Sequence, residues 1–321
     1  ANSTPRLSSA ASDVYKRQVQ FCRHLATGAP LPVTVKLKTR GNLMVDRRKF
    51  IQAGLAAGLA SSLPFRHFIK DAYGESGILG VLSDPAAQPK FKYYVPNALD
   101  PSFIYSPRPS GEYEVAAAAN PDHMTGLLAP DGVTPVKTPV WGYGDPSTAS
   151  FTWPGRTFEV KSVSAGGEAE TRIRWLNQLG NSHLLPVDTS LHWCYALHGY
   201  MTSIEDSGVP IITHVHGGHS DYQFDGNPEF FYNPGASITG PQWENVPGRF
   251  TDLFHYDNDV RAGNLWYHDH ALGITRLNVY AGLAGFYFVR DEYDTGRADN
   301  PIGLPAGPYE LAYAIQDRMF H

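Results

Sequence analysis

The sequence predicts an all-β sandwich. Gly (31 residues) and Pro (25) are frequent and 12% of the residues are aromatic, a composition typical of short strands joined by turns. Apolar and polar side chains also alternate along several segments, as expected of strands that bury one face. The six segments with this alternation are 156–163, 169–176, 209–216, 249–256, 263–268 and 282–290.

The first residues of the chain do not contribute to this fold. Asp13-Val14-Tyr15-Lys16-Arg17-Gln18 resembles the in-frame translation of a transposon end that is used in DNA library preparation. We therefore expect residues 1–43 to be a non-native leader.

A charged and then apolar segment follows the leader. Arg47 and Arg48 precede a stretch rich in Ala, Gly and Leu that ends near Leu63. Segment 44–66 resembles a twin-arginine export signal, which would engage the twin-arginine export machinery and predicts a periplasmic or secreted protein. A surface amphipathic helix is the alternative interpretation of this segment.

Residues 67–305 are long enough to form one domain with a hydrophobic core. The alternating segments predict the strands of its body. Residues 67–136 are rich in Pro, Gly and Ala, and we expect them to wrap the domain as loops and edge strands.

Composition excludes several classes of function. The net charge is −5, and outside the export segment no basic block predicts a nucleic-acid partner. The apolar stretch in 44–66 is too short and too Gly-rich for a transmembrane helix, so we expect no integral membrane protein. Two cysteines, Cys22 and Cys194, are too few for a disulfide framework, and we expect Cys194 to be a buried, unreactive thiol.

Two His-x-His pairs are the strongest functional signal. His214 and His216 flank Val215, and His268 and His270 flank Asp269. Residues i and i+2 of a strand point to the same face, so each pair presents two imidazoles side by side. Adjacent strands would bring four imidazoles together. Such a set suits copper and is also acceptable to zinc; histidines that bind no metal are the remaining alternative.

The residues around both pairs resemble those of multicopper oxidases, in the branch of bacterial spore-coat laccases, bilirubin oxidases and phenoxazinone synthases. The matching segments are 172–177, 183–188, 211–219, 264–287 and 315–320. The resemblance implies a cupredoxin-like Greek-key β-sandwich. It also implies that 306–321 is a linker and the first strand of a second, truncated cupredoxin domain, so that the chain is an N-terminal fragment.

The resemblance assigns the four histidines to a trinuclear copper centre. His214 would bind the type 2 copper, and the type 3 pair would be bound by His216, His268 and His270. The family completes this centre with His-x-x-His-x-His and His-Cys-His motifs, and the Cys of the latter binds type 1 copper. Neither motif occurs in the sequence, so we expect a half-site that is inactive alone.

Further residues near the pairs are candidates for other roles. Asp225 stands where relatives carry an acid near the copper centre, and we predict a catalytic role in proton relay; a turn before Gly226 is the alternative. His219 is three residues after His216 and should face away from the metal. Asp269 lies between two ligands, and we expect it to face away from the metal as well.

The implied activity is that of a laccase-like oxidase. The full-length protein would couple one-electron oxidation of phenolic or bilirubin-type donors to four-electron reduction of dioxygen to water. One alternative is a copper-free exported scaffold of the cell-division type, which lacks the ligand histidines that this chain keeps. Another is a cuprous-ion oxidase; such proteins are Met-rich, whereas this chain has 4 Met.

Overall fold

The computed structural model describes residues 86–197 and 200–318. They belong to one compact unit. The predicted leader, 1–43, and the predicted export signal, 44–66, lie outside the described residues.

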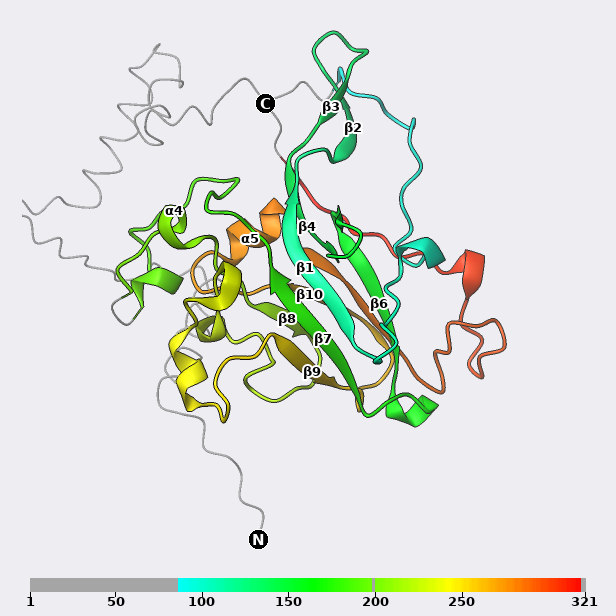
Figure 1. Ribbon diagram of the computed structural model, residues 1–321. Coiled ribbons are helices and arrows are strands. Elements are labelled where there is room, and N and C mark those ends of the chain that lie inside the picture. The colour runs from blue at the N-terminus through cyan, green and yellow to red at the C-terminus, as the bar shows by residue number, and fades with distance from the viewer. Residues whose placement is uncertain (1–85, 198–199, 319–321) are drawn as a thin grey trace, which may run out of the picture. The chain divides into compact units, whose positions relative to one another are not determined.

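Two β-sheets form the body of the domain (Figure 1). The first has the order β5 (Ser150–Thr152), β4 (Val140–Asp145), β1 (Tyr113–Asn120), β7 (Glu170–Asn177) and β9 (Leu253–Asp257). The second has the order β6 (Gly155–Lys161), β11 (Ala284–Arg290), β10 (Gly263–Asp269) and β8 (Thr213–His216). Each sheet contains one parallel pair, β1 with β7 and β6 with β11. Parallel neighbours require crossover connections.

The remaining elements are short. β2 (Met124–Leu128) and β3 (Pro135–Lys137) form a separate two-stranded sheet. Within the described residues the α-helices are α4 (Ile204–Ser207) and α5 (Thr275–Ala281), and α5 lies against β10 and β4. The 3₁₀ turns are η1 (Pro101–Phe103), η2 (Val163–Ala165), η3 (Cys194–Ala196), η4 (Pro228–Phe230), η5 (Pro234–Ala236), η6 (Pro241–Asn245) and η7 (Gly307–Tyr309).

These sheets confirm the prediction of an all-β, cupredoxin-like sandwich, and each of the six alternating segments contains a strand. The segment 209–216 forms a strand only from Thr213 onward. Pro210 has no N–H to donate to a ladder, and Ile211 pairs with Tyr232 in an isolated bridge.

The expectation of only loops and edge strands over residues 67–136 was wrong for β1. This strand lies in the middle of the five-stranded sheet, between β4 and β7. Its sequence runs through four consecutive alanines, Ala116–Ala119, and Ala has a low strand propensity. Ala116, Ala117 and Ala118 are nevertheless buried. β1 therefore forms because other elements bury both of its faces, which the local sequence does not reveal.

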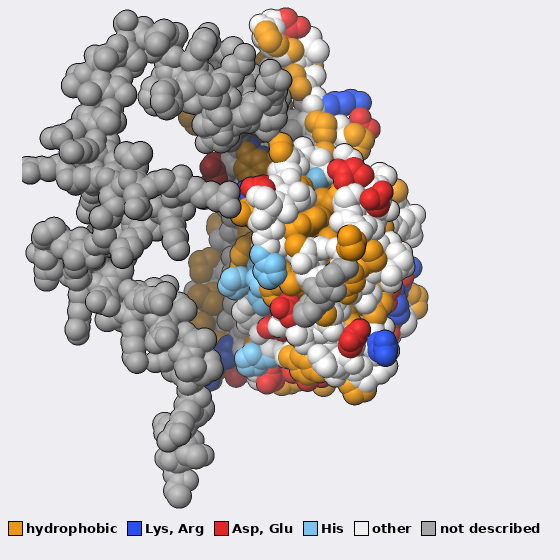
Figure 2. Space-filling model, turned by 90° about the vertical axis from the view of Figure 1, so that its left-hand side faces the viewer, with side chains coloured by type: hydrophobic (Ala, Val, Ile, Leu, Met, Phe, Trp, Pro, Cys, Tyr) orange, Lys and Arg blue, Asp and Glu red, His pale blue; other side chains and the backbone are white. Residues whose placement is uncertain are grey.

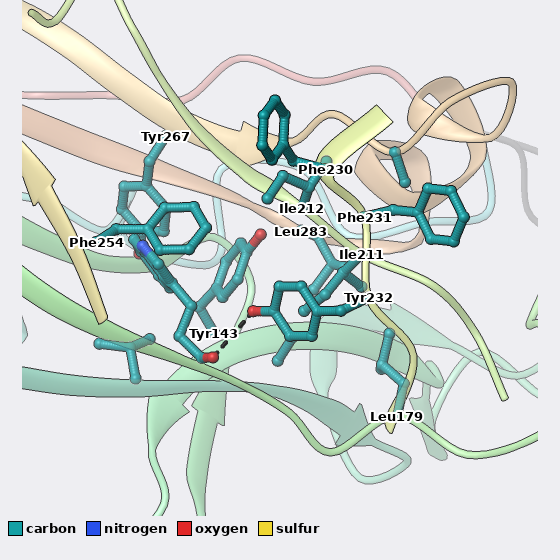
Figure 3. Close-up of a cluster of buried hydrophobic side chains, with 14 of the residues drawn as sticks. Tyr143, Leu179, Ile211, Ile212, Phe230, Phe231, Tyr232, Phe254, Tyr267 and Leu283 are labelled. Atoms are coloured by element: carbon teal, nitrogen blue, oxygen red, sulfur yellow. Dashed lines mark hydrogen bonds between the residues drawn. The ribbon is translucent and has the colours of Figure 1, made fainter. Parts of the chain in front are cut away.

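Aromatic side chains from both sheets fill the space between them. The Tyr267 ring centroid lies 5.1 Å from that of Tyr143, 5.4 Å from that of Trp175 and 5.2 Å from that of Phe158. Figure 3 shows Tyr143, Tyr267 and Phe254 within this cluster, and the hydrogen bond that Tyr232 Oη donates to the Trp175 carbonyl at 2.9 Å. The polar ends of these large rings therefore find partners inside the core.

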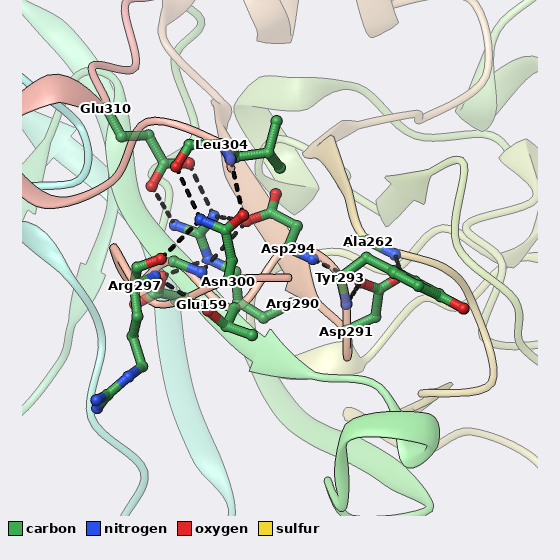
Figure 4. Close-up of polar contacts among 12 residues, drawn as sticks. Glu159, Ala262, Arg290, Asp291, Tyr293, Asp294, Arg297, Asn300, Leu304 and Glu310 are labelled. Atoms are coloured by element: carbon green, nitrogen blue, oxygen red, sulfur yellow. Dashed lines mark hydrogen bonds and ion pairs between the residues drawn. The ribbon is translucent and has the colours of Figure 1, made fainter. Parts of the chain in front are cut away.

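A buried arginine ties the end of β11 to later parts of the chain (Figure 4). Arg290 Nε lies 2.7 Å from Glu159 of β6, and its Nη1 lies 3.0 Å from Asp294 and 2.8 Å from Glu310. The Arg290 side chain is 6% exposed. Three carboxylates thus compensate one buried guanidinium.

The segment after η7 forms no strand in the part of the chain that the structure describes. Residues 310–318 instead run beside the domain, where the Ala98 N–H donates to the Ala312 carbonyl at 2.9 Å. Of the strand predicted within 306–321, no part is formed up to residue 318, where the described residues end. The division of the chain into domains stays a prediction.

Two negative expectations concern membranes and thiols. Over the described ranges, the structure contains no helix that is long and apolar enough to span a bilayer. Cys194 is a free, buried thiol, and burial raises its pKa well above the usual range. A thiol of this kind is unreactive, as predicted.

Candidate metal centre

Strand pairing brings the two His-x-His pairs together. β8 and β10 are antiparallel neighbours, with His214 opposite His268 and His216 opposite Trp266. Val215 and Tyr267 point into the core, so the alternating residues His214, His216 and His268 share the outer face of the sheet. Figure 2 shows pale-blue His side chains gathered on one face of the molecule.

The four imidazoles form a compact group. The ring centroid of His214 lies 5.4 Å from that of His216, 5.5 Å from that of His268 and 5.2 Å from that of His270. The potential ligand atoms of His214, His216 and His268 all lie within 4.8 Å of one another. This confirms the predicted clustering of the two pairs.

Backbone carbonyls select the tautomer of three of these rings. The Nδ1 atoms of His214, His268 and His270 face the carbonyl oxygens of Asp225, Asp269 (2.7 Å) and Gly226 (2.8 Å), respectively. A carbonyl oxygen only accepts, so each Nδ1 carries the proton and each Nε2 keeps a free lone pair. His216 differs, because its Nδ1 lies 3.4 Å from His268 Nε2 and faces the group.

Gly226 allows the loop with two of these carbonyls to approach. Its φ is +74°, and a Cβ atom there would lie 2.6 Å from the His214 Cα and 2.8 Å from the Thr213 carbonyl oxygen. A side chain would therefore push the loop away from β8. Sequence reasoning treated Gly226 as a turn residue only; its contact with β8 and its role in holding His270 depend on the fold.

Burial keeps two of the imidazoles neutral. It lowers the pKa of His268 to about 4, although the carbonyl of Asp269 opposes the shift. Burial also lowers the pKa of His214, against the carbonyl and carboxylate of Asp225. Neutral imidazole is the form that binds metal.

Trp266 is a site residue that the sequence did not single out. Its ring stacks on His268, with centroids 4.1 Å apart and planes 28° apart, and on His216 at 5.3 Å and 22°. It is 37% exposed. Its position two residues before His268 could have identified it, because residues two apart on a strand share a face.

Asp225 and His219 lie in different surroundings. Asp225 has a 53% exposed side chain, and its Oδ1 lies 3.4 Å from His214 Nδ1, on the side of the ring that the loop covers. His219 pairs with Asp259 at 2.8 Å and is 63% exposed, outside the group of potential ligands. The expectation that His219 faces away from the metal is confirmed.

Beneath the histidines lies a buried polar network. Asp269 faces the interior, as predicted, and accepts hydrogen bonds from the N–H groups of Ile212 and Ala271 and from Asn278. Burial raises the pKa of the Asp269 carboxyl to about 7, although these three hydrogen bonds oppose the shift. Asn278 in turn contacts His183 Nε2 at 3.0 Å.

The donor set fits a transition metal. Several imidazole nitrogens converge, and most of the rings are oriented by a hydrogen bond at the other nitrogen, as in protein metal sites. Nitrogen donors of this type suit copper or zinc.

Three relatives connect this chain to known proteins. The chain is 36% identical over 185 residues to the multicopper oxidase LPR1 of Arabidopsis thaliana, a match that covers 57% of this chain and 28% of the relative. It is 34% identical over 181 residues to a laccase of Bacillus subtilis (56% of this chain, 30% of the relative). It is 31% identical over 292 residues to a laccase of Haloferax volcanii (86% and 41%). No protein-family model matches the chain. The chain thus spans well under half the length of each of these relatives.

Proposed function

Because this chain belongs to the multicopper oxidase family, we propose that it is the N-terminal part of a laccase-like enzyme. The enzyme would couple one-electron oxidation of phenolic or bilirubin-type donors to four-electron reduction of dioxygen to water. The observation that carries this proposal is the convergence of His214, His216 and His268, with His270 beside His214. Residues 67–305 would be the first cupredoxin domain, and 306–321 the linker and first strand of a second cupredoxin domain.

In this proposal the four histidines hold half of a trinuclear copper centre. His214 would bind type 2 copper, and His216, His268 and His270 would bind the type 3 pair. When bound, copper supplies the one-electron redox chemistry that dioxygen reduction needs. The ligands of the type 1 copper would lie outside these 321 residues, since the sequence has no His-Cys-His motif.

The protein would prepare the ligands before metal binds. The carbonyls of Asp225, Gly226 and Asp269 hold the Nδ1 protons of three rings and leave Nε2 free. Ligands fixed in this way lose little conformational entropy on binding metal.

Asp225 would move protons. Reduction of one dioxygen molecule to two water molecules consumes four electrons and four protons. The Asp225 carboxylate is half-exposed and lies beside His214 Nδ1, so it contacts both solvent and one of the proposed copper ligands. A carboxylate in this position can take up a proton from water and pass it inward.

A copper titration of the 321-residue chain tests the metal site. We expect Cu²⁺ to bind through imidazole nitrogens, seen by electron paramagnetic resonance, without blue type 1 absorption and without phenol oxidation. His214→Ala and His268→Ala should each lower the affinity at least about tenfold, whereas the exposed His219→Ala should not. A chain that bound Zn²⁺ but not Cu²⁺, or neither metal, would contradict the proposal; the latter would fit the copper-free scaffold.

The catalytic part of the proposal needs a completed enzyme. In a protein extended by the downstream reading frame, His268→Ala should abolish dioxygen reduction. Asp225→Asn should keep the copper but slow turnover and change its pH profile. Normal turnover of Asp225→Asn at all pH values would exclude the relay role.

We also propose that the protein is exported to the periplasm or beyond by the twin-arginine machinery, from the sequence of 44–66. Changing Arg47 and Arg48 together to Lys should retain the product in the cytoplasm, as measured by fractionation. Unimpaired export of this variant would show that the segment is not a twin-arginine signal.

A further inference from the structure

We infer that Asp269 is a positioning residue that, with Asn278, fixes the two His-x-His pairs relative to each other. This inference rests on the proposed function, because it concerns the same histidines. Its evidence is a set of buried hydrogen bonds on the opposite side of the strands from the imidazoles.

A single carboxylate connects both ligand segments. Asp269 Oδ1 accepts from the Ile212 N–H at 3.1 Å, two residues before His214. Asp269 Oδ2 accepts from the Ala271 N–H at 3.1 Å, directly after His270. The side chain is fully buried, so these N–H groups depend on the carboxylate rather than on water.

Asn278 fixes the carboxylate in turn. Its Nδ2 donates to Asp269 Oδ2 at 2.8 Å and to the Pro210 carbonyl at 3.2 Å. His183 Nδ1 accepts from the Leu185 N–H at 2.9 Å, so the proton is on Nε2, which donates to Asn278 Oδ1. Both amide ends of Asn278 therefore have partners, and the orientation of Asn278 is determined.

The hydrogen-bonded pair Asp269 and Asn278, called the clamp below, acts where the ladder between β8 and β10 ends. The β8–β10 pairing includes His214 and His268, but its last pair is Thr213 with Asp269. His270 lies beyond that pair, and its own N–H donates to the Ile212 carbonyl at 2.7 Å. The position of His270 relative to His214 thus depends on this one backbone bond and on the hydrogen bonds of Asp269.

An isosteric exchange tests the clamp. In Asp269→Asn an amide NH₂ replaces one carboxylate oxygen. Whichever oxygen it replaces, this NH₂ faces an N–H donor, either that of Ile212 or those of Ala271 and Asn278. Asn300→Asp is the matched control. It also exchanges amide and carboxylate in a buried side chain, but its partners are the backbones of Arg297 and Leu304, away from the ligand strands.

The first measurement uses Cu²⁺ and the 321-residue chain. We expect Asp269→Asn to lower copper affinity about 10- to 100-fold and to change the electron paramagnetic resonance spectrum. Asn300→Asp should change neither. The reciprocal variant Asp269→Asn/Asn278→Asp restores a donor and an acceptor across the pair and should recover part of the affinity, which a general loss of stability would not.

The second measurement needs no metal and separates the two proposals. Amide hydrogen exchange of the metal-free chain should show protected Ile212 and Ala271 N–H groups that lose protection in Asp269→Asn but not in Asn300→Asp. If the wild-type chain shows this pattern but binds no copper, the proposed function fails and the clamp stands. If Asp269→Asn keeps both protected amides or binds copper within about twofold of wild type, the clamp is refuted.

Discussion

Gly226→Ala should damage both stability and metal binding, because Gly226 lies where backbone conformation and close packing coincide. Its φ is +74°, which costs a residue with a side chain about 1–2 kcal/mol. The added Cβ would lie 2.6 Å from the His214 Cα. The loop must therefore move by roughly 0.9 Å to restore a carbon–carbon distance of about 3.5 Å.

That movement would weaken the hydrogen bonds that His214 and His270 donate to the loop carbonyls. Each is worth about 0.5–1.5 kcal/mol, so the total loss for Gly226→Ala is about 2–5 kcal/mol. Copper affinity should fall about 10- to 100-fold, since the rings lose the groups that orient them.

Gly235→Ala is the matched control for this prediction. Gly235 has a φ of +73°, but a Cβ there would meet nothing within 4 Å. This variant should lose only about 1–2 kcal/mol and keep its copper affinity. Urea denaturation followed by tryptophan fluorescence gives the first quantity and copper titration the second. Equal losses in both variants would refute the role of close packing at Gly226.

Three further predictions concern other parts of the domain. Burial lowers the pKa of His183 below its ordinary 6.5, so as the pH falls the unfolded chain takes up a proton at His183 before the folded chain does. The free energy of unfolding is therefore undiminished above pH 6.5 and falls as the pH drops below it. Denaturation between pH 5 and 8 should show a smaller pH dependence for His183→Gln than for wild type, and an unchanged dependence would contradict this. Arg290→Met removes the buried partner of three half-buried carboxylates and should cost about 1.5–3 kcal/mol in urea denaturation, whereas the exposed Arg297→Met should change little; similar losses would exclude a special role for Arg290. Because Trp266 stacks on His268, bound Cu²⁺ should quench its fluorescence, and Trp266→Phe should remove most of that quenching; equal quenching in the variant would show that copper binds elsewhere.

The local pattern of the sequence determined much of the candidate site. The strand period alone predicted that His214 and His216 lie side by side on one face, and Val215 between them points into the core. The same period predicted that Asp269, between His268 and His270, faces away from the metal. It also located the strands that carry these residues, since alternation is a property of neighbouring positions.

Tertiary structure decided the features that depend on residues far apart in the chain. The carbonyl of Gly226 reaches His270 across 44 positions, and Asp269 Oδ1 reaches the N–H of Ile212 across 57. The central position of β1 also depends on neighbours that its alanines do not specify. Strand period specifies the face on which a side chain lies, whereas the tautomer and separation of the imidazoles depend on which loop packs behind each ring. That packing is fixed only when the two sheets and their connecting loops assemble.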